Sequence, residues 1–212
     1  MNPLYNTQEG IELSGGIAAL KAEDLKLIHF ADVVMTTRPP DFDFQADAEH
    51  AQHLADVLRD KMAVVGGIGL SANQIGLPYR VFVFGTGEQF TIMFNPNIVG
   101  ASEEKVLFRE GCLSFPGFFL TLSRPASIVI SYQDVTGTVM TAQYEGVAAR
   151  VIQHEYDHME GLNFTNHASH YKLQYELTKW KKQYRKHMQK LMNTPHTGEP
   201  NGPTEIAGVS SA

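Results

Sequence analysis

Residues 153–161 read Gln-His-Glu-Tyr-Asp-His-Met-Glu-Gly, and this stretch is the most informative in the chain. It contains His-Glu-x-x-His, with His154 and His158 four residues apart. On a helix this spacing places both imidazoles one turn apart on the same face, where they can reach one metal ion. Glu155 follows the first histidine directly, and its carboxylate could move protons to and from water on that ion. His and Glu are also common in ordinary helices, so the spacing alone leaves both a metal site and a plain helix surface open.

The single cysteine of the chain lies in a second distinctive stretch. Residues 110–117 read Glu-Gly-Cys-Leu-Ser-Phe-Pro-Gly, with the cysteine at position 112. One cysteine cannot form a disulfide within the chain, which fits a reducing compartment. Cys112 could be a buried thiol that packs as a small apolar side chain, the commonest role of a lone cysteine. As a thiolate it could instead complete a Cys-His-His metal site with a fourth position for water.

A third stretch is rich in glycine. Residues 66–74 read Gly-Gly-Ile-Gly-Leu-Ser-Ala-Asn-Gln. Gln74 could donate a hydrogen bond to a negatively charged oxygen, or it could be a buried amide that follows helix-ending glycines. No Lys-Ser or Lys-Thr follows the glycines, which excludes a phosphate-binding loop of the P-loop type.

Together these stretches resemble the signature of the peptide deformylase family. The family pattern is Gly-x-Gly-Leu-Ala-Ala-x-Gln, then Glu-Gly-Cys-Leu-Ser, then Gln-His-Glu-x-Asp-His. The second and third stretches match at every specified position, and the first departs once, at Ser71, where alanine is usual. The resemblance spans roughly residues 27–165, and three ordered motifs are far more specific than a lone His-Glu-x-x-His. Residues 30–42 hold only a weak equivalent of the Pro-Asp-x-x-Leu-Arg run of bacterial members, and look more like divergent members from phages and some bacteria.

The resemblance implies a function and a set of site residues. The expected reaction removes the formyl group from the N-terminal formyl-methionine of nascent polypeptides and releases formate. The expected metal ligands are Cys112, His154 and His158. Glu155 is expected to take a proton from water on the metal and to deliver it to the departing amine. Gln74 and the backbone N–H of Leu113 are expected to stabilise the oxyanion.

The same resemblance identifies substrate-binding positions and a cofactor. Ile68, Gly69 and Gly111 match positions where the family's peptide pairs with the backbone as an added strand. The cofactor is expected to be one divalent metal ion, with Fe²⁺ as the native ion and Zn²⁺ or Ni²⁺ as alternatives in purified protein.

Two other functions remain open at this point. A zinc endopeptidase shares His-Glu-x-x-His but needs a third His or Glu ligand downstream, for which His167 or Glu176 could be nominated. That reading leaves the Cys112 motif unexplained. A non-catalytic binding protein on the same fold is the second alternative, and the intact motifs argue against it.

The remaining sequence predicts an α+β fold with short, mostly antiparallel strands around a central metal-binding helix, plus a C-terminal helix. Helices are expected at residues 46–65, 145–161 and 169–191, and strands at 81–84, 92–94, 98–99, 106–108, 127–133 and 138–144. The expected organisation is a flexible N-terminal extension (1–20), a catalytic domain (21–168), a basic amphipathic helix (169–191) and a disordered tail (192–212).

Charge is distributed unevenly along the chain. The formal net charge is -6, but Lys172 to Lys190 contains seven Lys or Arg residues and one Glu, a balance of +6. The rest of the chain therefore carries -12. An apolar stripe at three- and four-residue spacing could dock this helix and leave its charges outward, facing either water alone or the RNA of a ribosome.

The sequence also predicts a cellular setting and one ion pair. No apolar run is long enough to cross a bilayer, and the first residues lack the pattern of a signal peptide, so we expect a cytoplasmic monomer without membrane contact. The histidine pairs at 50/53 and 167/170 lack acidic or thiol partners at ligand spacing, so we expect no metal there. We also expect Glu110 and Arg124 to pair and stiffen the loop that carries Cys112.

Overall fold

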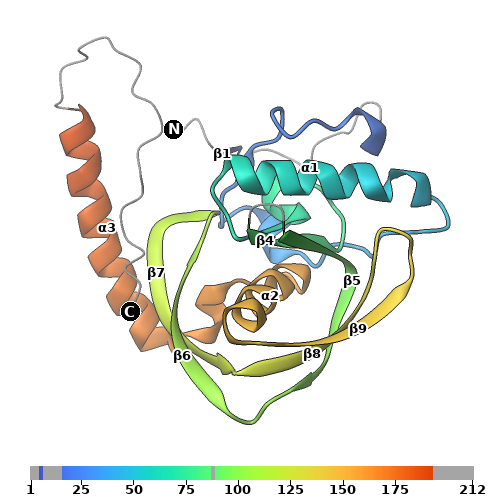
Figure 1. The fold of residues 1–212 in the computed structure, drawn as a ribbon. Helices are drawn as coiled ribbons and strands as arrows, with labels where there is room; N and C mark the ends of the chain where they lie inside the picture. The colour runs from blue at the N-terminus through green and yellow to red at the C-terminus, as the bar shows by residue number, and fades with distance from the viewer. Residues whose placement is uncertain (1–4, 7–15, 87–88, 193–212) are drawn as a thin grey trace.

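The computed structural model describes residues 5–6, 16–86 and 89–192, which form helices and mostly antiparallel strands (Figure 1). Five antiparallel strands build the largest sheet, in the order β3-β4-β5-β8-β9. Their bounds are β3 Gly69–Ser71, β4 Val81–Thr86, β5 Gln89–Ala101, β8 Ser127–Gln133 and β9 Val139–Glu145. A long hairpin, β6 Lys105–Cys112 and β7 Phe115–Pro125, forms a second sheet. A short parallel pair, β1 Tyr5–Asn6 and β2 Leu27–Ile28, forms the third.

The α-helices are α1 Ala51–Val64, α2 Gly146–Met159 and α3 His170–Met192. Short 3₁₀ turns connect the elements, at Ile17–Ala19, Val33–Thr36, Ala48–His50, Ala72–Ile75 and Phe164–His167. Figure 1 shows α2 between the β6–β7 hairpin and the five-stranded sheet, with α3 on the outer side of β7. The predicted α+β class and the central position of the His-Glu-x-x-His helix are thus confirmed.

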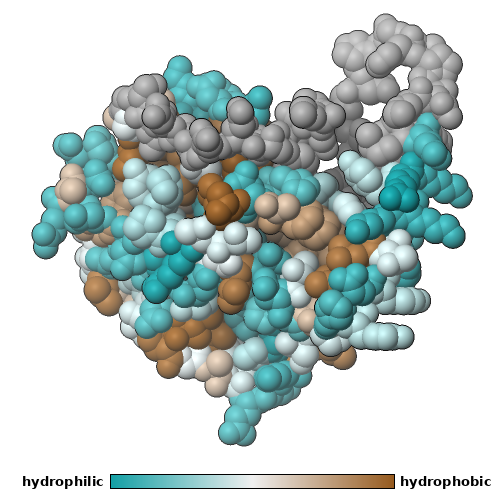
Figure 2. Space-filling view, turned by 180° about the vertical axis from the view of Figure 1, so that it is seen from behind, coloured by the Kyte–Doolittle hydropathy of each residue, from teal (hydrophilic) through white to brown (hydrophobic). Residues whose placement is uncertain are grey.

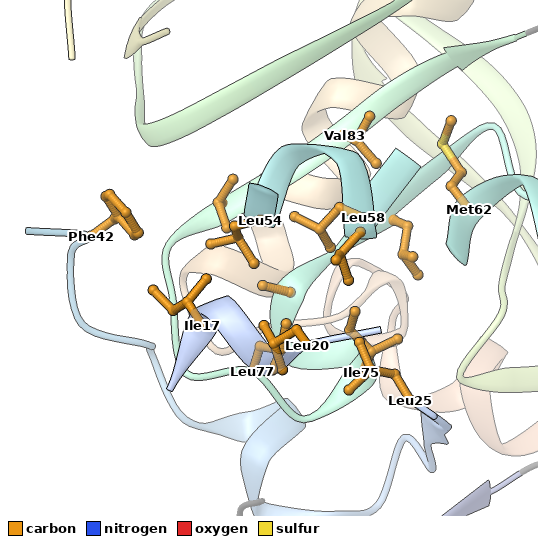
Figure 3. Packing of buried hydrophobic residues seen from close by; sticks show 14 of the residues in the cluster. Ile17, Leu20, Leu25, Phe42, Leu54, Leu58, Met62, Ile75, Leu77 and Val83 are labelled. Atoms are coloured by element: carbon orange, nitrogen blue, oxygen red, sulfur yellow. The ribbon is translucent and has the colours of Figure 1, made fainter. Parts of the chain in front are cut away.

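The largest apolar cluster lies between α1 and the sheet (Figure 3). Leu54, Leu58 and Met62 project from α1 at four-residue steps, so a single face of the helix is buried. Ile17 and Leu20 belong to the same cluster and are 3% and 7% exposed. The expected flexible extension to residue 20 therefore differs from the structure at its end, because these two side chains pack into the core. Most of that extension, and the expected tail beyond residue 192, lie outside the described residues.

The C-terminal helix α3 packs on the β6–β7 side of the molecule through an aromatic cluster. Leu173, Leu177 and Trp180 contact a buried group that includes Phe115 and Phe118. The indole Nε1 of Trp180 also donates a hydrogen bond to the carbonyl oxygen of Pro116, at 3.2 Å. The expected apolar stripe is therefore docked over its first half. Its continuation at positions 188 and 191 consists of side chains that the structure does not describe.

Five basic side chains of α3 face outward, as expected, whereas Lys172 is half-buried and donates to the carbonyl oxygen of Thr121, and the side chain of Lys190 lies outside the described set. The exposed set comprises Lys179, Lys181, Lys182, Arg185 and Lys186. Figure 2 shows hydrophilic side chains of this helix along the right-hand edge of the molecule. None of the helices in the described ranges is both long and apolar enough to span a membrane.

The two longest strands differ from the sequence-based prediction, and the short strands β1, β2 and β3 were not predicted. The expected strands 92–94 and 98–99 are parts of one long strand, β5, which continues through Pro96 because register shifts against β8 accommodate the proline. Strand β7 was not predicted, although it holds the second half of the hairpin that carries Cys112. These two strands have 13 and 11 residues, so the sheets contain longer strands than expected.

Candidate metal centre

Two structural elements bring the candidate ligands together. Cys112 is the last residue of β6, and His154 and His158 lie on α2. The possible ligand atoms of the three residues all lie within 4.8 Å of one another. The Sγ atom of Cys112 is 3.4 Å from Nε2 of His158. Both histidines are buried, whereas Cys112 as a whole residue is half-buried.

The end of the β6–β7 hairpin aims the cysteine toward the helix. The register shifts between Gly111 and Cys112, so that Gly111 faces Phe119 while Cys112 faces Phe115. This irregularity lets Cys112 turn away from the regular alternation of the strand. A Cβ added to Gly111 would lie 2.6 Å from the Phe119 ring, so glycine is required by the close approach of that ring.

A buried ionic network supports His154. Nδ1 of His154 is 3.3 Å from Oε2 of Glu110, which is 5% exposed. Arg124 holds Glu110 with two contacts, Nε to Oε1 at 2.8 Å and Nη2 to Oε2 at 2.9 Å. Arg150 adds a third contact, from Nη1 to Oε1 at 2.8 Å. The predicted ion pair between Glu110 and Arg124 is confirmed, and it is part of a larger network that fixes one ring nitrogen of a candidate ligand.

This network shifts the acidity of Glu110. Burial alone would raise the pKa of the carboxyl group, but hydrogen bonds from His154, Arg124 and Arg150 and the charge of Arg124 lower its pKa to about 2. Glu110 is therefore an anion at neutral pH and can accept the Nδ1–H of His154. That arrangement leaves Nε2 of His154 available to a metal.

Asp157 extends the network to the following turn. Its Oδ2 accepts from Arg124 Nη1 at 2.8 Å and lies 2.8 Å from Nε2 of His167. Burial would raise the pKa of Asp157, but the contacts with His167 and Arg124 lower it. Asp157 lies inside the family motif quoted above, but its partners come from β7 and the turn after α2 and could not be read from sequence spacing.

Glu155 is buried beside the ligand cluster. It is 3% exposed, and its Oε2 has no hydrogen-bond partner among the described residues. A Cβ at Gly69 would come within 2.5 Å of Oε1, so the glycine gives the carboxylate its space. Burial raises the pKa of Glu155 to about 7, against the opposing charges of His154 and His158. A carboxyl group with this pKa can both accept and release a proton near neutral pH.

Gln74 is oriented by its carbonyl end. Oε1 accepts the backbone N–H of Ser71 at 3.0 Å and contacts the Ser71 hydroxyl at 3.1 Å. Nε2 is thereby turned toward the centre, 3.4 Å from both Sγ of Cys112 and Oγ of Ser114. Ser71, the one departure from the family pattern, thus adds a contact that holds the amide in this direction.

The ligand group has the chemistry of a metal site. Burial would raise the pKa of the Cys112 thiol, but the charges of His158 and His154 and their hydrogen bonds lower it to about 5. Burial would lower the pKa of His154, but Cys112 and Glu110 raise it well above its ordinary value. Nδ1 of His158 is buried and has no partner among the described residues. A thiolate next to two imidazoles is the donor set of Zn²⁺ and other transition-metal sites, so the residues fit a metal ion.

The remaining candidate residues surround this group. Leu113 and Gly111 are half-buried beside Cys112, Gly69 is buried, and Ile68 is 50% exposed. Sequence reasoning missed Arg150, which lies four residues before His154 on α2 and therefore on the same helix face. The four-residue spacing between Arg150 and His154 was the sequence feature that could have identified Arg150.

The two residues nominated as the third ligand of an endopeptidase form ion pairs with other residues. His167 pairs with Asp157 at 2.8 Å, and Glu176 pairs with Lys179 on α3 at 3.2 Å. Neither belongs to the cluster of possible ligands found among the described residues. Both residues nominated as the third ligand of a zinc endopeptidase therefore lie outside the cluster found in the described part of the chain.

Comparisons with known proteins agree with this geometry. Residues 25–174 match the family model described as polypeptide deformylase. Peptide deformylase 1B, chloroplastic/mitochondrial, from Arabidopsis thaliana is 37% identical over 146 residues, covering 66% of this chain and 52% of that protein. The chain spans about half the length of the curated plant relatives that it matches.

Solved structures give the same result. The crystal structure of a probable peptide deformylase from Synechococcus phage S-SSM7 aligns with a TM-score of 0.64 at 38% identity, covering 68% of this chain and 99% of that one. A plant peptide deformylase aligns with a TM-score of 0.69 at 33% identity, covering 78% of this chain and 92% of that one.

Proposed function

The chain belongs to the polypeptide deformylase family, and we propose that it hydrolyses the formamide of N-terminal formyl-methionine on nascent polypeptides, releasing formate. The observation that carries this proposal is the group of Cys112, His154 and His158, whose possible ligand atoms lie within 4.8 Å of one another. Glu155 and Gln74 lie next to it. Each motif residue that the family pattern specifies around this group is present apart from the alanine replaced by Ser71.

Cys112, His154 and His158 would hold one divalent metal ion. Such an ion supplies Lewis-acid polarisation of a carbonyl and lowers the pKa of water. We propose Fe²⁺ as the native ion, with Zn²⁺ and Ni²⁺ as replacements acquired during purification. Metal analysis after anaerobic purification tests this identity, because ferrous iron next to a thiolate is lost or oxidised in air. Zinc as the only bound metal in anaerobically prepared protein would contradict it.

Glu155 acts as the proton carrier. Its buried carboxylate has one oxygen without a partner among the described residues, and its pKa is raised to about 7. It can accept a proton from the attacking water and release it to the amine that leaves. The same group serves both steps because its two protonation states are of similar free energy at neutral pH.

Gln74 and Leu113 bind the developing oxyanion. Ser71 orients the Gln74 amide so that Nε2 faces the ligand group. The backbone N–H of Leu113, next to Cys112, is the second donor. Each such donor contributes about 3 kcal/mol to the transition state in other acyl-transfer enzymes.

Two strand edges that pair with no further strand among the described residues offer a path for the peptide. β3 is an edge strand of the five-stranded sheet, and β6 pairs only with β7 within the described part of the chain. Ile68 and Gly69 lie at the first edge and Gly111 at the second. We propose that the peptide adds as a strand at these positions, with its backbone hydrogen bonds supplied by both edges.

The deciding experiment measures formate release from formyl-Met-Ala-Ser by anaerobically prepared, metal-loaded protein. We expect turnover that disappears with a chelator and returns with added metal. A metal-loaded protein that leaves the peptide formylated would contradict the function and favour a non-catalytic binding protein. Cys112→Ala is the companion variant, because an endopeptidase that does not use this thiol would keep its metal.

We propose that the basic face of α3 brings the enzyme to ribosomes. Five cations on this face are exposed, and phosphate attraction suits a partner rich in RNA. Cosedimentation with ribosomes at rising salt is the test, comparing wild type with a variant in which Lys181, Lys182, Arg185 and Lys186 are changed to Glu. Lys21→Glu combined with Lys26→Glu and Lys105→Glu provides a control on other exposed lysines. Unchanged binding of the α3 variant would leave the helix with a structural role alone.

We propose a cytoplasmic monomer with a catalytic domain at 21–168 and a basic helix at 169–191. A ligand thiolate must stay reduced, which favours the cytoplasm. Light scattering should give a mass of 23.5 kDa for a monomer, and a doubled mass would contradict it.

A further inference from the structure

Strand β6 carries an exposed guanidinium next to the proposed peptide path. Arg109 lies two residues before Gly111, so both occupy the same face of the strand. Across the hairpin, Gly111 pairs with Phe119 and Arg109 with Thr121. The guanidinium carbon of Arg109 lies 4.4 Å from the centroid of the Phe119 ring. Stacking on an aromatic face fixes the direction of this long side chain and so lowers the entropy that it loses when it binds an anion.

The charge of Arg109 is not neutralised by a carboxylate. No ion pair with Arg109 occurs among the described residues, and the side chain is exposed. It lines a cleft of about 160 Å³ between the β6–β7 hairpin and α3, together with Phe119, Lys179 and Trp180. The one carboxylate in the lining, Glu176, lies 3.2 Å from Lys179. The cleft therefore has a surplus of one positive charge in a chain whose net charge is -6.

The position of Arg109 along the strand sets which part of the peptide it meets. Arg109 lies three positions before Cys112, which corresponds to about 10 Å at ~3.3 Å per residue of strand. A peptide held as an added strand rises by the same amount per residue. With its formyl group at the ligand cluster, its third or fourth residue comes alongside Arg109.

We propose that Arg109, stacked on Phe119, selects peptides with an acidic side chain at the third or fourth residue. This inference rests on the proposed deformylase function and adds a substrate preference to it. Lys179 contributes to the same positive cleft from α3. Arg109 acts here as a specificity-determining residue and takes no part in the bond-breaking step.

The experiment compares three amidated peptides, formyl-Met-Ala-Xaa-Xaa-amide, in which Xaa is Glu, Gln or Lys. The amide removes the terminal carboxylate, so the two Xaa side chains carry the only difference in charge. We expect kcat/KM of the wild type to be about 3- to 5-fold higher for the Glu peptide than for the Gln peptide, as for a solvent-exposed ion pair. This ratio should fall toward one between 0.05 M and 0.5 M salt, because salt screens the attraction.

Substitutions of cleft residues test which side chain causes the preference for the Glu peptide. Arg109→Gln should bring the Glu/Gln ratio close to one, and Arg109→Glu should invert it in favour of the Lys peptide. Phe119→Leu keeps the cation but removes the ring that holds it, so the ratio should be intermediate. Lys105→Gln is the matched control, because Lys105 is an exposed cation on the same strand and face, four residues farther from Cys112. It should keep the wild-type ratio.

Three results would overturn the proposal while leaving the deformylase function intact. They are equal turnover of the three peptides by the wild type, an unchanged ratio in Arg109→Gln, and an equal loss for all three peptides in that variant. Absence of turnover for every peptide is a different result, because it contradicts the proposed function itself.

Discussion

Helices α2 and α3 both carry many charged residues, but they use them in opposite ways. On α2 the charged residues Arg150, Glu155 and Asp157 are all less than 10% exposed. On α3 the cations Lys179, Lys181, Lys182, Arg185 and Lys186 face solvent, and the apolar side is covered. The difference follows from what surrounds each helix, since α2 lies between the hairpin and the sheet whereas α3 contacts the protein on one side (Figure 1). Buried charges such as those of Arg150 and Asp157 on α2 therefore have partners, whereas the exposed charges on α3 do not require them.

The largest expected effect is on stability, and it comes from Glu110. Glu110→Gln keeps the volume but leaves Arg124 and Arg150 buried with less negative charge around them. Removing one partner of a buried ion pair costs about 3–5 kcal/mol. Chemical denaturation at neutral pH should show this loss, and the metal should dissociate faster into a chelator because His154 loses an anionic partner.

The pH dependence of Glu110→Gln gives a separate check. The pKa of Glu110 is lowered from its ordinary 4.5 to about 2, so its stabilising contribution is present above pH 4.5 and is lost as the pH falls toward 2. The difference in unfolding free energy between wild type and variant should shrink over that range. A constant difference from pH 6 to pH 2.5 would show that Glu110 does not stabilise as an anion.

The second prediction concerns catalysis on α2. Glu155→Gln keeps the shape but cannot accept a proton, so turnover of a formyl-Met peptide should fall by at least ~100-fold. Metal content, measured on the same preparation, should not change, because Glu155 is outside the ligand group. Near-normal turnover by the metal-loaded variant would reject Glu155 as the proton carrier.

The same contrast explains what the sequence could predict. The proximity of Cys112, His154 and His158 was predictable because the two histidines are four residues apart on one helix and Cys112 stands in a specific motif. The apolar stripe of α3 was predictable for the same reason, since it depends only on spacing. The partners of Asp157 and the position of Arg150 near Glu110 depend on how β6, β7 and α2 pack, which spacing within one segment cannot specify. Strand β7 was missed because Pro116 and Gly117, near its start, are typical of turns.

A smaller effect is expected where α3 meets the domain. Trp180→Ala removes the indole from Phe115 and Phe118 and loses the hydrogen bond to Pro116. Trp180 is only half-buried, so we expect about 1–2 kcal/mol, below the range for a fully buried Trp. Hydrogen exchange should become faster in α3 while α2 stays protected. Equal loss of protection in both helices would show that α3 unfolds only together with the domain.

The smallest effect is expected on the outer face of α3. Changing Lys181 and Lys182 to Gln removes two cations that have no ion pair among the described residues, and both side chains are exposed. Surface substitutions of this kind change stability by less than about 0.5 kcal/mol. Thermal unfolding of the double variant should therefore overlay that of the wild type at low and high salt. Lys179→Gln serves as the control, because it loses the contacts with Glu176 and the Tyr175 ring and should cost slightly more. A large destabilisation by the double variant would mean that these charges support the fold. The exposed charges of α3 would then contribute to stability as the buried charges of α2 do, and the contrast between the two helices would not hold.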